Sequence, residues 1–290
     1  MDKKIYLGVS MLIFNAMLLA ACAKAESSMG ANDEGDELVE ESIAVASIEV
    51  ENEGTGFCAN AFFPISSRNT WKYSASVRDK SDEYTVSFKD ITDSSFASME
   101  STIDSDNEVN WICTDKGLVS STYFNLLSNH SNNVVSEVTD ISGVTLPTED
   151  EWVEGLTWDL NYQINVVIHR DANREGTPPP NGEVQPPEGE DILPAQEEEP
   201  FLEDGEDIQT EGEITITRKI AKIERITVTA GTFEDAYRVD SSGVMTVTIR
   251  DTQTSMPLLY SDWYVKGVGV VKSSSSDANA PFSLELVAVQ

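Results

Sequence analysis

The amino-acid sequence predicts an all-β fold with mainly antiparallel strands, and three observations support this prediction. From Phe57 onward, short runs rich in Val, Ile, Thr, Tyr and Trp recur between turn residues. Apolar and polar residues alternate within these runs, with Leu284 and Leu286 on one face of a strand and Ser283 and Glu285 on the other. No stretch has the periodicity of an amphipathic helix of about 12 or more residues.

The expected strands follow one another along the chain, each bounded by turn residues such as Gly, Pro, Asn and Asp. They cover residues 69–77, 84–91, 95–103, 109–113, 117–123, 141–146, 158–169, 213–228, 233–239, 244–250, 261–265, 268–273 and 282–289. Residues 125–133 add a short turn or helix at most. The strands together predict one β domain over residues 57–290.

An acidic, proline-rich insertion interrupts this domain over residues 171–213. It contains 15 acidic residues, a single basic residue and the run Thr177-Pro178-Pro179-Pro180. Such a segment buries too little apolar surface to offset the entropy of the chain, which predicts disorder. The strands on either side are expected to pair as a hairpin, with the insertion as its loop. Loose Ca²⁺ binding or docking is the alternative to a solvated loop, although no Asp-x-Asp-x-Asp-Gly spacing is present.

Residues 1–21 have the layout of a secretory signal, with a basic start and an apolar stretch from residue 5 to residue 21. The closing residues Leu19-Ala20-Ala21-Cys22 resemble a lipobox, in which a small residue precedes the cleavage site and the cysteine thiol receives a diacylglyceryl group. We therefore expect cleavage before Cys22 and acylation with fatty acids such as palmitate. An uncleaved membrane helix, which needs about 20 apolar residues, and ordinary cleavage without lipid are the alternatives.

Residues 22–56 are expected to form an acidic, disordered tether behind the lipidated Cys22. Residues 25–54 contain ten acidic residues and neither a basic nor an aromatic residue. Membrane lipid attached to Cys22 would hold the β domain outside the cytoplasm. No Asp follows the cysteine, so an outer-membrane location is expected if the cell has an outer membrane.

The net charge of the chain is −32, from 19 basic and 51 acidic residues. Residues 25–54 contribute −10 and residues 171–213 contribute −14, so these two segments carry −24 of the total. The excess of acidic residues argues against nucleic acid or an anionic membrane surface as a partner, because both require Lys and Arg. The charge belongs to the two segments more than to the β domain.

Lipid attachment at Cys22 leaves Cys58 and Cys113 as an even pair in an oxidising compartment, which favours a disulfide between them. A reactive thiol pair or a metal site is the alternative. Only His130 and His169 could supply imidazole ligands, and neither lies in a cluster with metal-ligand spacing. No metal and no cofactor are expected.

Two segments open a strand on Trp after an apolar residue and Pro. Phe63-Pro64 precedes Trp71, and Leu146-Pro147 precedes Trp158, which is followed by Tyr162. Core packing at the start of a strand is one interpretation. The sharper one is that Trp71, Trp158 and Tyr162 line a ligand site.

Three stretches resemble a family of uncharacterised bacterial lipoproteins, the TapB-like group. They are the opening from Phe63-Pro64 to Trp71-Lys72-Tyr73, the turn from Val228 to Glu234, and the hairpin from Trp263 to Lys272. Arg68 and Thr229 depart from the family pattern, which has Gly and Pro there. The resemblance implies a single twisted sheet, curved into a half-barrel like those of the lipoprotein carriers LolA and LolB, and it brings no known catalytic residues.

No catalytic motif stands out, neither a Gly-x-Ser-x-Gly elbow nor a His-Glu-x-x-His helix nor a nucleophile with an evident base. We therefore expect no enzymatic activity. The first hypothesis is a membrane-anchored lipoprotein whose curved sheet binds an apolar ligand or a lipidated protein partner. The alternative is a structural or interaction module, displayed on the cell surface without a small-molecule pocket. The oligomeric state is left open.

Overall fold

The computed structural model describes residues 48, 50–77, 80–103, 105–122, 134–168, 207–249, 252–275, 277 and 281–290. The strands of these residues form one sheet in the order β6-β8-β9-β10-β11-β12-β13-β1-β2-β3-β4-β5-β7. Every neighbouring pair in this order is antiparallel. The sheet stays open, with β6 and β7 as its edges. The prediction of an all-β fold with a single antiparallel sheet is therefore confirmed.

One half of the sheet is built around the first strand of the domain, which lies between its sequence neighbour and the last strand of the chain. This half contains β1 (Thr70–Val77), β2 (Lys80–Lys89), β3 (Ser95–Ser101), β4 (Asp106–Thr114), β5 (Gly117–Ser120), β7 (Leu146–Pro147) and β13 (Phe282–Val289). Two short 3₁₀ helices, η1 (Gly56–Cys58) and η2 (Glu149–Glu151), precede β1 and β8 respectively.

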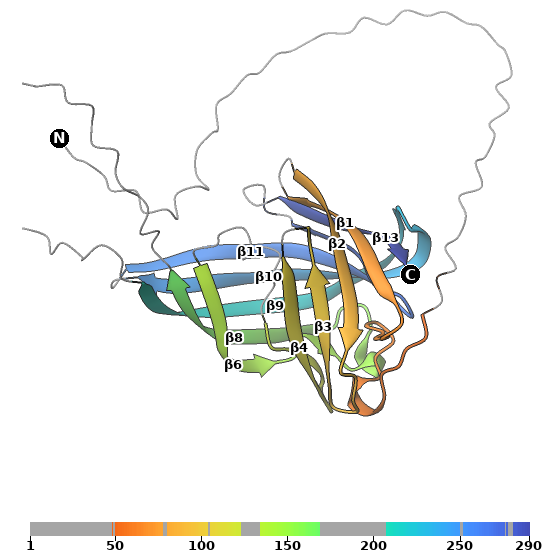
Figure 1. Cartoon of the computed structure of the whole chain (residues 1–290), viewed down its shortest axis with the longest axis horizontal. Helices are drawn as coiled ribbons and strands as arrows, with labels where there is room; N and C mark the ends of the chain where they lie inside the picture. Colours follow the sequence, from red (N-terminus) through yellow and green to blue (C-terminus); the bar gives the residue numbers. More distant parts are fainter. Residues whose placement is uncertain are drawn as a thin grey trace, which may run out of the picture.

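The other half consists mainly of long strands. It contains β6 (Val134–Gly143), β8 (Thr157–Ile168), β9 (Ile208–Val228), β10 (Gly231–Ile249), β11 (Thr252–Val265) and β12 (Gly269–Ser275). Strands β8 to β11 run along the length of the molecule, and β1 to β4 run across this direction (Figure 1). As the insertion hypothesis expects, β8 and β9 pair, with Ile168 opposite Ile208.

The two edge strands of the sheet are close neighbours in the chain, which shows how strongly the sheet curves. Strand β6 ends at Gly143 and β7 begins at Leu146, so two residues join the opposite edges. With about 3.8 Å between consecutive Cα atoms, the edges lie within roughly 11 Å of each other there. Thr145 in this link donates its N–H to the Leu118 carbonyl of β5 at 2.8 Å, and its own carbonyl accepts from Arg218 of β9 at 2.8 Å.

The main hydrophobic core lies inside this curve; most of its side chains come from β1 to β5 and β9 to β13, and others come from η1, β7 and the loops. A smaller cluster continues along the long strands and includes Leu160, Tyr162, Ile164, Ile214 and Ile216. Both clusters follow from the two-residue period of a strand, which sends alternate side chains to the inner face. A disulfide between Cys58 and Cys113 ties η1 to β4 with Cα atoms 5.1 Å apart, the pairing that the sequence favours.

Three of the expected strands have other bounds in the structure, and glycine explains where one of them is divided and why the other two are joined. The strand expected at 141–146 is divided: Gly143 has φ 89°, a conformation that favours glycine, and ends β6. The break expected between 239 and 244 is absent, because β10 runs unbroken from Gly231 to Ile249. Gly243 permits this continuity, since a Cβ there would lie 2.3 Å from the Thr215 carbonyl oxygen of β9.

At two places, ordered residues of the β domain begin earlier in the chain than the sequence predicts. Strand β9 begins at Ile208, before the expected end of the acidic insertion at residue 213. The domain also begins before Phe57, because the N–H of Glu53 donates to the Ile65 carbonyl at 2.8 Å and Val50 packs against the main core. Acidic composition suggested a solvated chain at both places, but local backbone pairing and a few apolar contacts hold these residues on the fold.

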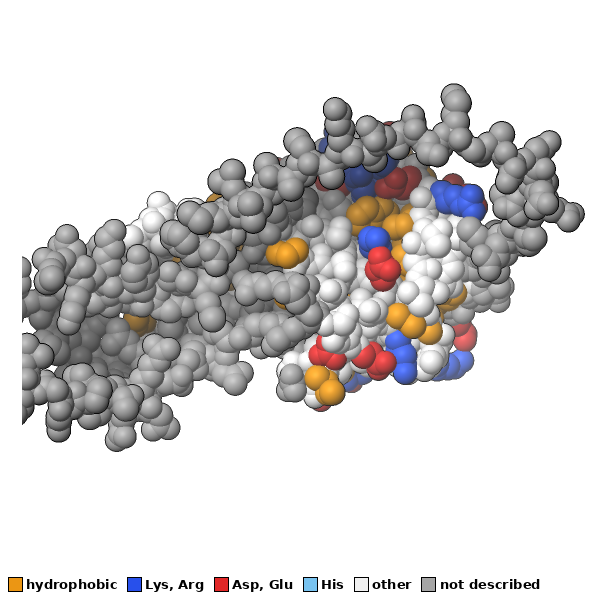
Figure 2. Space-filling view, turned by 90° about the horizontal axis from the view of Figure 1, so that it is seen from above, with side chains coloured by type: hydrophobic (Ala, Val, Ile, Leu, Met, Phe, Trp, Pro, Cys, Tyr) orange, Lys and Arg blue, Asp and Glu red, His pale blue; other side chains and the backbone are white. Residues whose placement is uncertain are grey.

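Several predictions lie outside the described residues. They concern the signal at 1–21, Cys22 and most of its tether, the turn at 125–133, His130, His169 and the acidic insertion up to residue 206. Within the described part of the chain, no helix has the length and apolar character needed to cross a membrane. The face of the domain in Figure 2 shows acidic and basic side chains interspersed with small apolar patches.

Candidate functional site

A cavity of about 200 Å³ lies between the two halves of the curved sheet. Its lining is mostly aromatic and aliphatic, and the aromatic members include Trp71, Tyr73, Tyr84, Phe88, Trp111 and Tyr162. An apolar cavity of about 150 Å³ is large enough to bind benzene, whereas pockets for drug-sized ligands occupy about 300–1,000 Å³. This cavity therefore has room for a single ring or a short chain segment.

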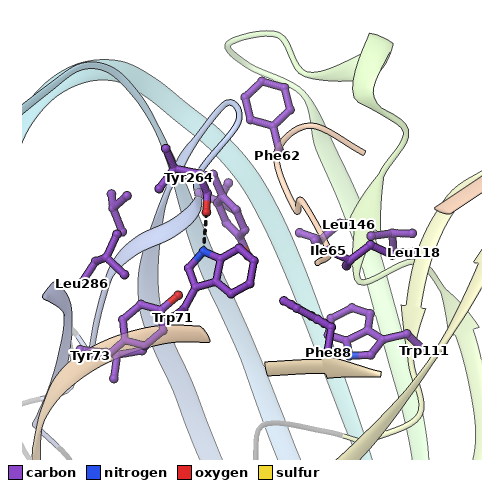
Figure 3. Close-up of a cluster of buried hydrophobic side chains, with 14 of the residues drawn as sticks. Phe62, Ile65, Trp71, Tyr73, Phe88, Trp111, Leu118, Leu146, Tyr264 and Leu286 are labelled. Atoms are coloured by element: carbon purple, nitrogen blue, oxygen red, sulfur yellow. Dashed lines mark hydrogen bonds between the residues drawn. The ribbon is translucent and has the colours of Figure 1, made fainter. Parts of the chain in front are cut away.

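The aromatic side chains of the cavity are held in place by specific contacts. The indole Nε1–H of Trp71 donates to the Val268 carbonyl at 2.8 Å, and that of Trp111 donates to Ser98 Oγ at 3.1 Å. The rings of Trp71 and Phe88 meet edge to face with centroids 5.1 Å apart. Figure 3 shows Trp71 with its hydrogen bond, in the same cluster as Tyr73, Phe88 and Trp111. The polar atoms of both indoles are thus hydrogen-bonded within the protein, so these two side chains present apolar ring surface to the cavity.

The three residues proposed from the sequence as ligand-lining have different positions. Trp71 is the second residue of β1 and Tyr162 lies in the middle of β8; both are buried and both line the cavity. Trp158 is the second residue of β8 but is not part of the lining. It lies opposite Arg218 of β9, whose guanidinium carbon is 5.6 Å from the centroid of the Trp158 ring. Trp158 thus packs against Arg218, and it is Arg218, not Trp158, that lines the cavity.

Arg218 and Asp262 form a buried ion pair on the wall built by the long strands. Arg218 Nη2 lies 2.5 Å from Asp262 Oδ2, and both residues line the cavity. The guanidinium also donates to Ser241 Oγ at 3.1 Å, to the Thr145 carbonyl at 2.8 Å and to the Tyr264 hydroxyl at 3.2 Å. The pair therefore joins β9 to β10, to β11 and to the link between the two edge strands.

The electrostatics of this pair are set by burial and by its neighbours. Burial acts to lower the pKa of Arg218, but Tyr264, Tyr260 and Asp262 outweigh it and the pKa is raised. Burial raises the pKa of Asp262, opposed by Arg218 and by the hydroxyl of Ser273, which donates to Oδ1 at 2.6 Å. Burial likewise raises the pKa of Tyr162 to about 12. This wall thus presents a permanent cation whose charge is already compensated.

The opposite wall carries a carboxyl group that forms no ion pair with any Lys or Arg of the described residues. Glu100 of β3 lines the cavity, and its side chain is hydrogen-bonded to the Tyr84 hydroxyl. Burial raises the pKa of Glu100, while the hydrogen bond with Tyr84 opposes that shift. None of the ion pairs formed among the described residues includes Glu100. Asn107 lies directly opposite it on β4, and its buried Nδ2 has no hydrogen-bond partner among the residues that the structure describes.

The polar residues of the cavity were missed by the sequence analysis, although alternation contains a signal for them. In β9 the inward positions are Ile214, Ile216, Arg218 and Ile220, so a charged residue occupies a place in an apolar series. Asp262 occupies such a position in β11, where Leu258 and Tyr264 are also buried. A charge on the inner face of a strand is a reason to look for a buried partner.

The described residues contain no group of three or more His, Cys, Asp or Glu side chains that could hold a metal ion. The polar chemistry of the cavity consists of the Arg218–Asp262 pair, the Glu100 carboxyl and the hydroxyls around them. These groups can orient a small molecule through hydrogen bonds and charge.

Part of the cavity lining lies within a segment of the chain that matches a known protein family. Residues 185–283 match the model of the DUF3108-like family, and this match covers β9 to β12 with Arg218 and Asp262. A candidate exported protein with a YmcC-like fold from Bacteroides fragilis is similar over 80% of this chain and 100% of its own, with 12% identity and a TM-score of 0.46. A candidate lipoprotein from Parabacteroides distasonis is similar over 80% and 99%, with 14% identity and a TM-score of 0.41. No curated protein matches the chain.

The resemblance to the TapB-like group, and the likeness to LolA and LolB that it implies, stay predictions. The structure places the three stretches that carry this resemblance at β1, at the β9–β10 turn and at the β11–β12 hairpin. The turn has Gly231 at φ 136° and the hairpin has Gly267 at φ 79°, so glycine has a conformational role in both.

Proposed function

We propose that this chain is an exported, membrane-anchored lipoprotein with no catalytic role, whose curved sheet binds a small apolar molecule. The observation that carries the proposal is the cavity between the two halves of the sheet, lined by Trp71, Tyr162 and other aromatic side chains. A structural module would gain stability by filling this space, because empty apolar volume destabilises a core.

The arrangement of the polar groups supports binding over catalysis. The guanidinium of Arg218 donates hydrogen bonds to Ser241, Thr145, Asp262 and Tyr264. These bonds connect neighbouring parts of the sheet, which is a structural role. A binding site of this kind needs apolar walls and a few fixed polar groups to orient the ligand. The cavity has both.

Binding can be measured with 2-phenylethanol, a neutral molecule with one ring, by calorimetry on the full chain carrying Cys22→Ala. We expect saturable binding that is lost in Val86→Trp, because Val86 is a partly exposed residue of the lining and the indole would fill the space. The matched control is Thr85→Trp, which puts the same ring on the other face of β2. Equal binding by both variants, or none by the parent protein, would contradict the proposal.

The membrane anchor rests on the lipobox-like residues that end at Cys22. Metabolic labelling of the host with a fatty-acid probe should label the natural protein and leave Cys22→Ala unlabelled. Equal labelling of the two proteins would refute acylation at this cysteine.

A structural or interaction module is the second candidate, and one observation favours it. The cavity is smaller than typical ligand pockets, and several of its lining residues, Trp71 and Leu284 among them, belong to the main core. Native mass spectrometry of protein purified from its own host separates the candidates. A co-purifying small molecule supports binding, and its repeated absence supports the module.

A further inference from the structure

We propose that the cavity selects an apolar amine, with the ammonium group of the ligand held by Glu100. This inference rests on the proposed binding function and adds the chemical class of the ligand. It follows from the different charges on the two walls of the cavity. One wall carries the Arg218–Asp262 ion pair, and the other carries the Glu100 carboxyl group, which is not paired with any Lys or Arg of the described residues.

Glu100 is positioned to meet a ligand. It is one of the residues that line the cavity, and its neighbours there include Tyr73 and Tyr84 on β1 and β2. Its cross-strand partners are Val86 on one side and Asn107 on the other, and neither carries a charge. Tyr84 supplies a hydrogen bond to the carboxyl group, and no Lys or Arg of the described residues is paired with it. A cationic donor is the group that this environment lacks.

Burial makes the carboxyl group effective for such a ligand. Removing a carboxylate from water is unfavourable, and Glu100 bears that penalty when the protein folds, as its raised pKa reflects. An ammonium group that enters the cavity then gains an ion pair without a second desolvation of the carboxylate. A preorganised partner of this kind adds to affinity because less is lost on binding.

The aromatic lining suits a cation as well as an apolar body. The faces of Trp and Tyr attract an ammonium group through the ring quadrupole, and this attraction is stronger away from water. Trp71, Tyr73 and Tyr84 all line the cavity together with Glu100. The remaining space accepts a ring or a short chain, which is the apolar part of the ligand.

An apolar carboxylate is the ligand class that the cavity disfavours. The positive charge of Arg218 is already opposed by Asp262 at 2.5 Å, and its donors also reach Ser241, Thr145 and Tyr264. A second carboxylate would gain little from Arg218 and would share the cavity with Glu100. Selection by charge is therefore built into both walls.

Three probes of equal size test the proposal: 2-phenylethylamine, 2-phenylethanol and phenylacetate, each measured by calorimetry at neutral pH on the full chain with Cys22→Ala. We expect the amine to bind about 10-fold or more tightly than the alcohol, because a hydrogen bond to a charged group changes affinity by about this factor. The acid should bind most weakly, because its carboxylate would lie near that of Glu100. Glu100→Gln should remove the advantage of the amine, so that the variant binds the amine and the alcohol with affinities within about 2-fold of each other. Glu83→Gln, an exposed position on β2, is the matched control and should change neither affinity.

The outcomes separate this inference from the proposed function. If the alcohol binds but the amine has no advantage, or keeps it in Glu100→Gln, the assignment of Glu100 is overturned while the binding cavity stands. If no probe binds, the proposed function itself fails. Binding of the alcohol by Glu100→Gln reports that the variant is folded. Should that variant not fold, Glu100→Asp, which withdraws the carboxylate by one methylene, should lower the affinity for the amine alone.

Discussion

Replacing Asp262 with Asn removes a negative charge from the buried pair with Arg218 and keeps the size of the side chain. The guanidinium of Arg218 stays inside, where the residue is 3% exposed, and its remaining partners are the neutral groups of Ser241, Thr145 and Tyr264. Breaking a buried ion pair by removing one partner costs about 3–5 kcal/mol of unfolding free energy, because the other charge is left uncompensated. With a urea m-value of about 3 kcal/mol/M, the unfolding midpoint should fall by roughly 1–1.7 M.

The assay is urea unfolding of the full chain, followed by tryptophan fluorescence. Asp240→Asn provides the matched control, since Asp240 pairs with Arg238 at 2.7 Å but both side chains are partly exposed. Its loss should stay below about 1 kcal/mol. The double variant Arg218→Met with Asp262→Asn should lose less stability than Asp262→Asn alone, because no unpaired charge remains. A loss for Asp262→Asn equal to that of the control would refute the reasoning.

Three further predictions concern stability. The double replacement of Cys58 and Cys113 by Ala should lower the unfolding free energy by about 4 kcal/mol, since the bridge closes a loop with a sequence separation of 55, and equal midpoints with and without it would contradict this. The pKa of Glu100 is raised above 4.5 in the folded protein. The stability that Glu100 contributes in its protonated form is therefore fully present below pH 4.5 and is lost as the pH rises through the folded pKa. The stability of the parent protein relative to Glu100→Gln should therefore fall as the pH rises above 4.5 in unfolding series, and a constant difference would speak against the shift. Leu286→Ala, at a fully buried position, should cost about 2–5 kcal/mol in thermal or urea unfolding, and Leu259→Ala, 39% exposed, clearly less; the reverse order would be incompatible with this core.

The strands could be located from the sequence because local patterns determine them. A few residues are enough to show the alternation of apolar and polar residues in Phe282–Val289 and the glycine turn at Gly231. Both appear in the structure where the sequence predicts them. The extents expected for β6 and β10 differ from those in the structure partly because glycine has two opposite roles in strands. Gly143 ends β6 through a positive φ, and Gly243 lets β9 approach β10 closely. Only the partners of each glycine distinguish these roles.

The sequence by itself determined the fold class, the pairing of β8 with β9 across the acidic insertion, and the expectation of an anchored protein with a Cys58–Cys113 bridge. These conclusions depend on local periodicity, composition and a count of cysteines. The tertiary structure alone decided that Trp71 and Tyr162 share a cavity and that Trp158 packs against Arg218. It also decided that Glu100 lines this cavity without an ion pair to any described Lys or Arg. The reason is physical: β3, β9 and β11 are far apart in the chain, and only the curvature of the sheet brings Glu100, Arg218 and Asp262 to the walls of one cavity.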